Sequence, residues 1–439
     1  MGRPHRFTAI TTLAARIPGG PDGRRLLAVA LVDRIGSGLW AATAVLYFTY
    51  VADLSPARIG LLLAVSGAIG VAGPPVAGHL ADRVRLRPLM TSVQTVRAAA
   101  ALALLTTTDL SLLCAIAAAG SLADRASSVL TKLYATRMAG PERTRYQAIN
   151  RTVANLGWAI GGLAAAAALA AGNPAVYRAL LIGDALSCAL AALITLRCQE
   201  PEVPSRVVAH GPRPASAAPG DPGAAESGPA TAPPNPWRDR GYLLYTATDA
   251  VLFLDDSVFK MGLTLWLVTG TSAPHGLAPL LLVLNNVLVV LLQVPFARFG
   301  ADPEAARRAL IPLAGIFLAA GAALALSALP APWIASTALI LAAAAFTLAE
   351  ILHSTISWEL SVALAPAQAQ GAYLGVHSLG QASQRSAGPL AVTAAMAAGP
   401  VGWLGFGAAI AAMCCVQRRL VDRQPTAPLS VPPITVSEH

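Results

Sequence analysis

Residues 78–87 read GHLADRVRLR and separate two long apolar stretches of the chain. The glycine that opens this segment, Gly78, lets two helices approach closely, and Asp82 can face the positive N-terminal end of a neighbouring helix. The arginines that follow hold such a loop on the cytoplasmic side of a membrane; they are Arg83, Arg85 and Arg87. The segment therefore predicts a short basic loop between two membrane-spanning helices.

The composition of the whole chain supports a membrane protein. Of 439 residues, 55% are hydrophobic and only 12% are charged, whereas soluble domains carry about 25% charged residues. The mean hydropathy is +0.59, which is too high for a globular chain with a polar surface. Since one helical span takes about 20 residues, the chain is long enough to cross a bilayer around a dozen times. An ordinary soluble enzyme is excluded.

Apolar runs broken by charges, proline and glycine predict twelve transmembrane helices. They start near residues 26, 57, 87, 110, 146, 174, 241, 276, 307, 332, 370 and 400. The expected fold class is therefore an all-α integral membrane protein, with its helices arranged as two pseudo-symmetric bundles of six.

Basic residues are distributed unevenly between the predicted loops. The net charge is +9, and 22 of the 31 basic residues fall on the side that includes both termini, against two on the other side. This bias predicts cytoplasmic termini in a multi-pass protein of the cell membrane. The basic residues form no continuous polar face, so a nucleic-acid partner is not expected.

Five segments follow from these patterns. We expect a cytoplasmic N-terminal tail over 1–25, a six-helix bundle over 26–198, a disordered cytoplasmic linker rich in Pro, Ala, Gly and Ser over 199–239, a second bundle over 240–420 and a cytoplasmic tail over 421–439. A short internal repeat supports the two halves, because it has a constant offset of 227 residues; it pairs Tyr146, Gly161 and Gly162 with Tyr373, Gly388 and Pro389. Duplicated halves are common in secondary transporters.

Residues 78–87 resemble the loop 2/3 signature of the major facilitator superfamily, Gly-x-Leu-Ala-Asp-Arg-x-Gly-Arg-Arg. The matching residues are Gly78, Leu80, Ala81, Asp82, Arg83 and Arg87, whereas Arg85 and Leu86 replace the Gly and Arg of the signature. The resemblance implies that this loop engages the cytoplasmic end of the other half as a conformational latch. Gly78, Asp82, Arg83 and Arg87 would then act in gating.

Residues 157–162 read GWAIGG and are similar to the antiporter motif of the same family, Gly-Pro-x-x-Gly-Gly, with Trp158 in the proline position. Gly157 and Gly161 also have the spacing of a small-residue packing face. Two interpretations stay open for Gly157, Gly161 and Gly162: helix packing, or a signature of antiport.

Charged residues inside predicted helices are the strongest indication of a functional site. Each costs at least about 2.5 to 3.5 kcal/mol at the centre of a span, so they should face the bundle interior or a wet cavity. The acids are Asp33, Asp124, Asp184, Asp249, Asp255, Asp256, Glu350 and Glu359, and the bases are Arg34, Arg97, Arg125, Lys132, Arg151, Lys260 and Arg385.

Most of these charges lie on the first, fourth, seventh and tenth predicted helices, which line the central cavity in the resembled family. The helical spacings within Asp249, Asp256 and Lys260, and within Glu350 and His353, place each set on one face. We therefore expect one cavity, lined by Asp33, Arg34, Trp40, Asp124, Arg125, Asp249, Asp256, Lys260, Glu350 and His353. The alternative is that individual charges form structural salt bridges.

A carboxyl group in such a cavity can bind and release a proton as the cavity opens to each side in turn. Our hypothesis is that Asp33 is the principal proton carrier, tuned by Arg34 or Arg125, with Glu350 and Asp256 as alternates. His353 and His377 can relay protons or simply pack, and Trp40 can stack on a substrate or belong to the core.

The sequence contains no G-x-x-x-x-G-K-[ST], HExxH or G-x-S-x-G motif, and its five cysteines lack the spacing of a metal site. We expect no enzyme activity, cofactor, metal or obligate protein partner. The favoured function is proton-coupled efflux of a small amphipathic or cationic organic compound by alternating access in a lipid bilayer. Uptake of a metabolite and a membrane sensor that transports nothing are the alternatives.

Overall fold

The computed structural model describes residues 17–169, 174–201 and 234–423, and the regular elements in these ranges are helices. Those of the first half are α2 (Gly20–Tyr50), α3 (Pro56–Gly70), α4 (Gly73–Ala81), α5 (Leu86–Ala103), α6 (Leu110–Ala139), the 3₁₀ turn η1 (Gly140–Glu142), α7 (Arg143–Leu169) and α8 (Pro174–Leu196). Those of the second half are α9 (Arg240–Leu252), α10 (Asp255–Ser257), the π turn η2 (Val258–Gly262), α11 (Leu263–Gly270), α12 (Leu277–Phe296), the 3₁₀ turn η3 (Ala297–Gly300), α13 (Pro303–Leu326), α14 (Pro332–Ala363), the 3₁₀ turn η4 (Ala367–Ala369), α15 (Gln370–Ala397) and α16 (Gly399–Asp422).

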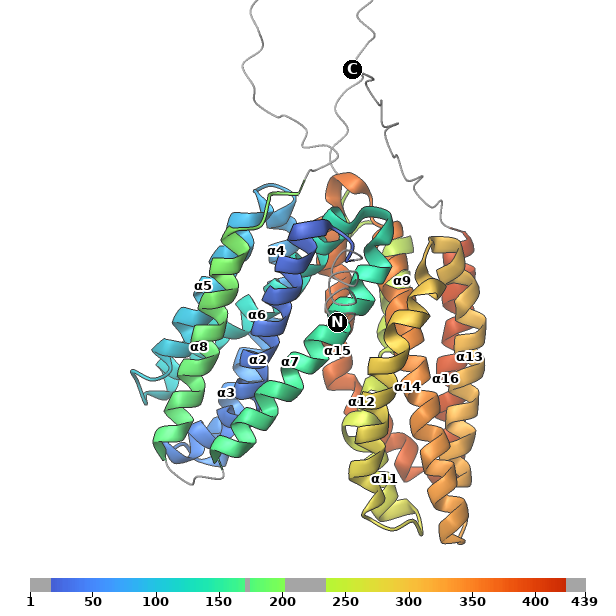
Figure 1. The fold of residues 1–439 in the computed structure, drawn as a ribbon. Helices are drawn as coiled ribbons and strands as arrows, with labels where there is room; N and C mark the ends of the chain where they lie inside the picture. The colour runs from blue at the N-terminus through green and yellow to red at the C-terminus, as the bar shows by residue number, and fades with distance from the viewer. Residues whose placement is uncertain (1–16, 170–173, 202–233, 424–439) are drawn as a thin grey trace, which may run out of the picture.

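The helices form two bundles that lie side by side (Figure 1). Helices α2 to α8 make the N-terminal half, and α9 to α16 make the C-terminal half. We call the end at which α8 ends and α9 begins the linker end; it is at the top of Figure 1. Most of the linker predicted over 199–239, as well as much of both predicted tails, lies outside the described residues.

Each predicted helix start lies within six residues of a helix start in the structure. The largest difference is at the first helix, where α2 begins at Gly20 rather than near residue 26. Gly19 precedes it with φ +81°, Pro21 stands in the first turn and Asp22 follows, which is a favourable helix start. The last six residues assigned to the N-terminal tail are therefore helical.

Seven helical segments of the described chain are long and apolar enough to cross a membrane, and a bent pair within α2 makes an eighth. One of the seven, Leu110–Leu169, contains both α6 and α7, which the left-handed Gly140 (φ +51°) separates. The segments that do not qualify include α5 and α15, whose sequences carry polar residues, and α9, which has only 13 residues. The count of twelve crossings stays a prediction.

The seventh predicted helix is broken. It begins at Arg240, close to the prediction, but α9 ends at Leu252, and η2 over Val258–Gly262 has π-helical hydrogen bonds. Such π segments are frequent at functional sites. The break lies between Asp249 and Asp256, and both residues contact α15, at His377 and Gln384 respectively.

The two halves pack against each other at the linker end. A cluster of buried apolar side chains from the N-terminal half also includes Trp358, Val362 and Leu374 of the C-terminal half. Gly78 of α4 lies so close to α15 that a Cβ atom there would be 2.1 Å from the carbonyl oxygen of Gly371. The linker end is therefore closed in this structure.

Candidate functional site

The loop after α4 joins the N-terminal half to the start of α15. Asp82 accepts hydrogen bonds from the backbone N–H groups of Gly371 and Ala372, both at 2.8 Å, and Arg137 lies 3.5 Å from it. A carboxylate at a helix N-terminus is electrostatically favourable. Burial raises the pKa of Asp82, whereas these N–H donors and Arg137 act in the opposite direction.

The other residues of the predicted latch have different surroundings. Arg83 and Arg87 are exposed. The backbone N–H of Arg87 donates to Glu200 at 3.0 Å, so this residue helps to fix the start of α5 to the residues after α8. Of the four latch residues, Gly78 and Asp82 therefore make the contact between the halves that the structure shows.

A second ionic contact at the linker end was not predicted from the sequence. Arg143, at the start of α7, binds Glu359 of α14 through Nε–Oε2 and Nη2–Oε1 distances of 2.9 and 2.5 Å. The hydroxyl of Thr144 donates to Gly300 O at 2.6 Å and contacts Glu359 at 3.0 Å. Sequence reasoning counted Arg143 only as a loop arginine, because its partner lies 216 residues away.

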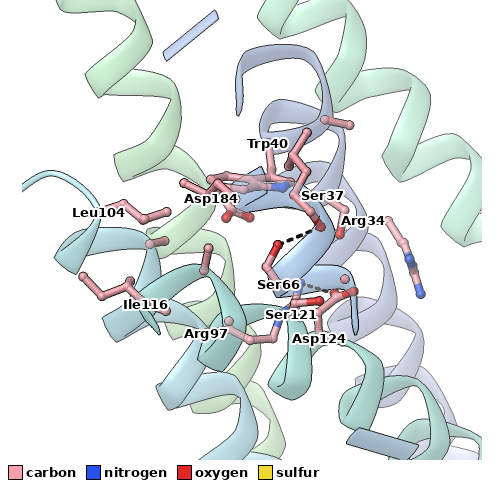
Figure 2. Close-up of a pocket in the computed structure, with 18 of the residues that line it drawn as sticks. Arg34, Ser37, Trp40, Ser66, Arg97, Leu104, Ile116, Ser121, Asp124 and Asp184 are labelled. Carbon is pink, nitrogen blue, oxygen red and sulfur yellow. Dashed lines mark hydrogen bonds and ion pairs between the residues drawn. The ribbon is translucent and has the colours of Figure 1, made fainter. Parts of the chain in front are cut away.

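A cavity of about 620 Å³ lies within the N-terminal half (Figure 2). Its walls come from α2, α3, α5 and α6, with one residue each from α7 and α8. Apolar side chains such as Leu62, Leu104 and Ile116 make up much of the wall, and polar ones face them. The polar and aromatic lining residues are Arg34, Ser37, Trp40, Ser66, Arg97, Ser121, Asp124, Trp158 and Asp184.

Arg97 is the centre of a buried charge cluster at this cavity. Its guanidinium makes a short ion pair with Asp33, lies 3.0 Å from Asp124 and donates to the side chain of Gln94 at 2.8 Å. Arg97 and Asp33 are both 8% exposed, whereas the side chain of Asp124 is 50% exposed. The cluster thus extends from the protein interior to the open cavity.

Asp184 of α8 is the second carboxylate of the lining, beside Asp124, whereas Asp33 pairs with Arg97 behind the lining. Asp184 is 8% exposed, and its Oδ1 has no hydrogen-bond partner among the described residues. The sequence analysis recognised Arg97 and Asp184 as charges within helices but did not place them at the site, because it favoured four other helices. Their position inside predicted spans was the signal that could have found them.

Two further predicted residues line the cavity. Arg34 is half-exposed, and its Nε lies 4.0 Å from Asp33 Oδ2, so the principal cationic partner of Asp33 is Arg97 rather than Arg34. Trp40 lines the cavity and contacts Phe48 edge-on with ring centroids 6.3 Å apart. Arg125 lies instead beside Gly70 of α3 and is not among the lining residues.

The predicted residues of the C-terminal half form a separate, sealed cluster around Asp249. This carboxylate lies 3.1 Å from His353 Nε2 and 2.8 Å from His377 Nε2. Ser357 Oγ and Gln417 Nε2 donate to it at 2.7 and 3.0 Å. Asp249 and both histidines are only 1% exposed, so this cluster does not border the cavity of the N-terminal half.

Glu350 forms a third group, between the halves. It makes a short ion pair with Arg151 of α7 and accepts a hydrogen bond from Asn285 of α12 at 3.2 Å. Asp256 contacts Gln384 at 3.4 Å, and the side chain of Lys260 lies outside the described residues. The prediction that all these residues line one cavity is therefore wrong, because Asp249, Asp256, Glu350 and His353 are not among the residues that line the cavity of the N-terminal half.

The glycines of the fifth predicted helix differ among themselves. A Cβ at Gly157 would be 2.7 Å from Leu31 O, and one at Gly161 would be 2.1 Å from Ile35 O, so both pack on the backbone of α2. A Cβ at Gly162 would meet nothing within 4 Å, although the backbone N of Gly162 would lie 2.9 Å from a Cβ at Gly38 of α2. Among the described residues, no group of three or more His, Cys, Asp or Glu could hold a metal ion.

Comparisons with known proteins agree on the class of this fold. The chain superposes on a bacterial homologue of the iron transporter ferroportin in its outward-facing state with a TM-score of 0.67, at 15% identity and over 91% of this chain and 98% of that one. For the human organic anion transporter MFSD10 (TETRAN), the TM-score is 0.57 at 17% identity, over 91% and 100%. For a double-tryptophan mutant of XylE it is 0.64 at 11% identity, over 92% and 95%.

These structural similarities define a helical, multi-pass membrane protein with a transporter fold. The sequence profile of the Major Facilitator Superfamily matches residues 26–389, and the chain belongs to this family of secondary transporters. No curated protein sequence matches it significantly.

Proposed function

We propose that this chain exports a small amphipathic or cationic organic compound in exchange for protons. The observation that carries the proposal is the pairing of Arg97 with Asp33 and Asp124 beside a cavity that Arg97, Asp124 and a further carboxylate, Asp184, line. The cavity volume of about 620 Å³ is in the range of small-molecule sites, roughly 300 to 1,000 Å³.

Charge balance provides the coupling. With all three acids ionised, Arg97 and the half-exposed Arg34 leave one negative charge uncompensated. Charge is costly in a low-dielectric site, so either a proton or a cationic substrate is favoured there, and binding of one weakens binding of the other. Mutual exclusion at one site is what exchange requires, and the excess of acid favours a cation over an anion.

Asp33 stays the proposed principal proton carrier, now as a member of a coupled set. Asp33 and Asp124 share Arg97, so a proton bound at either one changes the charge balance of both. Arg97 takes the tuning role that the sequence analysis gave to Arg34 or Arg125. Glu350 and Asp256 stay proposed alternates outside this cavity.

The aromatic walls support an amphipathic substrate. Trp40 and Trp158 both line the cavity, and aromatic faces bind apolar and cationic groups. Trp158 is also the residue that replaces proline in the antiporter-like segment, so this position contributes a side chain to the cavity instead of a kink.

Alternating access would then proceed by separation of the halves at the linker end. We propose that the linker end is cytoplasmic and that the protein lies in the cell membrane, as the arginine distribution predicts. Contacts of Gly78, Asp82 and Arg143 close this end here. Opening it would require these contacts to separate while the other end closes.

Direction and coupling can be tested together in cells that lack their main efflux pumps. Accumulation of a panel of organic cations, neutral drugs and metabolites is compared between empty vector, wild type, Asp33→Asn and Asp109→Asn at equal expression. Asp109 caps α6 outside the cavity, and Asn also caps helices well, so this variant is the control.

We expect wild type and the Asp109 variant to lower accumulation of at least one cation, and Asp33→Asn to abolish the effect. Higher accumulation with wild type would replace export by uptake. If purified protein in liposomes with an imposed pH gradient moves no member of the panel, a role as a membrane sensor is favoured instead.

A further inference from the structure

The sealed cluster of the C-terminal half has no part in the exchange proposed above. Asp249 accepts hydrogen bonds from Ser357 and Gln417, and both histidines direct Nε2 at it. If each histidine is neutral with its proton on Nε2, the cluster carries one negative charge. Asp249 and the two histidines are 1% exposed, so water cannot compensate that charge in this state.

A counter-charge comes from the other half of the molecule. Lys132 of α6 donates from Nζ to Ser361 Oγ of α14 at 2.7 Å and lies 4.8 Å from the ring centroid of Trp358. Ser361 is one helical turn, about 5.4 Å, from Ser357, which binds Asp249. The acids whose charges act on Lys132 are Asp249 and Glu359.

These contacts hold Lys132 beside α14 only while the linker end is closed. The partners Ser361 and Trp358 are both on α14 of the C-terminal half, whereas Lys132 belongs to the N-terminal half. When the linker end opens, the ammonium group moves away from α14. Asp249 stays behind with its histidines, and its negative charge then needs another positive charge.

The histidines are the groups that can supply it. His377 Nδ1 is buried without a hydrogen-bond partner among the described residues, so it has a free lone pair for a proton. His377 also stacks on Tyr245, with ring centroids 5.7 Å apart. It lies seven residues into α15, roughly 10 Å from the linker end of that helix, where water enters when the halves separate.

Other titratable groups surround the cluster on every packed helix. The charged and titratable neighbours are Lys132 of α6, Tyr242 and Tyr245 of α9, Asp255 of α10, Glu359 of α14 and Cys414 of α16. Of these, Lys132 is a cation of the opposite half. Glu359 is paired with Arg143 of the N-terminal half, and it loses this partner when the halves separate. A proton that enters on opening can therefore bind at Glu359 or at the Asp249 cluster, and the experiment below distinguishes the two.

We infer that Asp249, His353 and His377 form a proton-binding site whose occupancy alternates with Lys132: the ammonium neutralises the cluster when the linker end is closed, and a proton does so when it is open. The inference rests on the proposed function only in taking the linker end as cytoplasmic. The proton enters from the cytoplasm on opening and returns there on closing. The site therefore sets the cytoplasmic pH dependence of the cycle and adds nothing to net proton transport.

The sign of the pH effect follows from linkage. The open state binds the proton more tightly, because Lys132 is absent from it, so lower pH favours opening and higher pH favours closure. For one proton, the ratio of open to closed molecules changes at most tenfold per pH unit.

Spin-label distance measurements test this without a substrate. Labels are placed at Arg85→Cys and Gln368→Cys, two exposed positions at the linker ends of the two halves, with the exposed Cys415 replaced by Ser. The populations of short and long distances are measured from pH 5.5 to 8.5 for this parent protein and for variants of it. Cytoplasmic and external pH are equal in detergent, so no gradient is needed.

We expect the long-distance population of the parent to rise as pH falls, by up to tenfold per unit. His353→Gln with His377→Gln should flatten this dependence, since Gln can still donate to Asp249 but cannot take a proton. Each single variant provides the same comparison if the double variant does not fold. Lys132→Gln should flatten it too, because the proton then stays bound in the closed state.

Glu359→Gln is the matched control at the neighbouring acid. It should move the whole equilibrium toward the open state and leave its slope with pH intact. An unchanged slope in the histidine variants, or a slope lost only in Glu359→Gln, would overturn the inference. A parent protein that shows no pH dependence overturns it as well.

Exchange assays separate this site from the proposed function. In liposomes, the histidine variants should keep the ratio of protons to substrate and change only its dependence on the pH at the linker end. A changed ratio would overturn the inference, whereas loss of exchange in Asp33→Asn concerns the cavity alone.

Discussion

The two halves of the molecule hold similar chemistry in opposite environments. In the N-terminal half, Asp33 and Asp124 share Arg97, and the side chain of Asp124 is 50% exposed at a cavity. In the C-terminal half, Asp249 has four polar partners but is only 1% exposed. A charge cluster that opens on a cavity can exchange its partner for a ligand. A sealed one can respond only when the surrounding helices move.

The largest expected effect is at the centre of the open cluster. Arg97→Gln leaves Asp33 and Asp124 without their shared cation, and removal of one partner from a buried pair costs about 3–5 kcal/mol. Thermal unfolding of the purified protein in detergent measures this loss. Arg97→Lys, which retains the positive charge, should recover part of the lost stability. Equal stability of Arg97→Gln and wild type would show that Arg97 is not the cation that compensates these acids.

A smaller effect should separate the clusters by their function. Ser357→Ala removes a hydrogen bond to the sealed Asp249 carboxylate, which we expect to cost about 1.5–3 kcal/mol of stability without weakening substrate binding. Ser66→Ala, at the open cavity, is the matched variant: its hydroxyl donates to Leu63 O of its own helix. Unfolding curves measure the stability of the two variants, and substrate titrations measure their affinity for the exported compound. A changed substrate affinity in Ser357→Ala would contradict the separation of the two clusters.

Aromatic contact in the cavity should give a moderate effect. Trp40→Leu removes an aromatic face, worth about 0.5–1.5 kcal/mol, so we expect Kd for the exported compound to rise roughly two- to tenfold. Trp333, which is 73% exposed at the start of α14, gives the control Trp333→Leu. A Kd that is the same in both variants would remove Trp40 from the substrate site.

The smallest effect should come from a glycine whose Cβ position is open. Gly162→Ala meets no atom within 4 Å, so stability should change by about 0.5 kcal/mol or less. Gly161→Ala, one residue earlier, must displace the backbone of α2 and should be clearly destabilised. Similar unfolding temperatures for the two variants would show that the packing of α7 on α2 is wrong.

The sequence was sufficient for the helices and for one contact between the halves. Apolar runs and their flanking prolines and glycines located each helix start within six residues, because burial and helix chemistry are local properties. Asp82 could be assigned to a facing helix N-terminus because its loop motif is specific. Gly157 and Gly161 likewise had a spacing that indicates close packing.

The grouping of charges could not be obtained in this way. The pairs Arg97 with Asp33, Arg143 with Glu359 and Arg151 with Glu350 join residues 64, 216 and 199 positions apart, and each depends on how helices rotate against one another. The periodicity of the sequence also predicted one continuous seventh helix, whereas α9 ends at Leu252 and a π-helical segment follows at Val258–Gly262. The number of a helix in the chain therefore proved a poor guide to which acids face the cavity.

The close contact of Gly78 with α15 helps to determine whether the linker end rests closed or open. Gly371 O and the Cα of Gly375 lie 2.1 and 3.2 Å from the place a Cβ of residue 78 would take. A single methyl group there would act as a wedge, shifting the molecule toward its other orientation without altering any charge. Because this part of the preference depends on volume, it is insensitive to ionic strength, whereas the exposed charges of Arg83 and Arg87 at the same end are screened by salt.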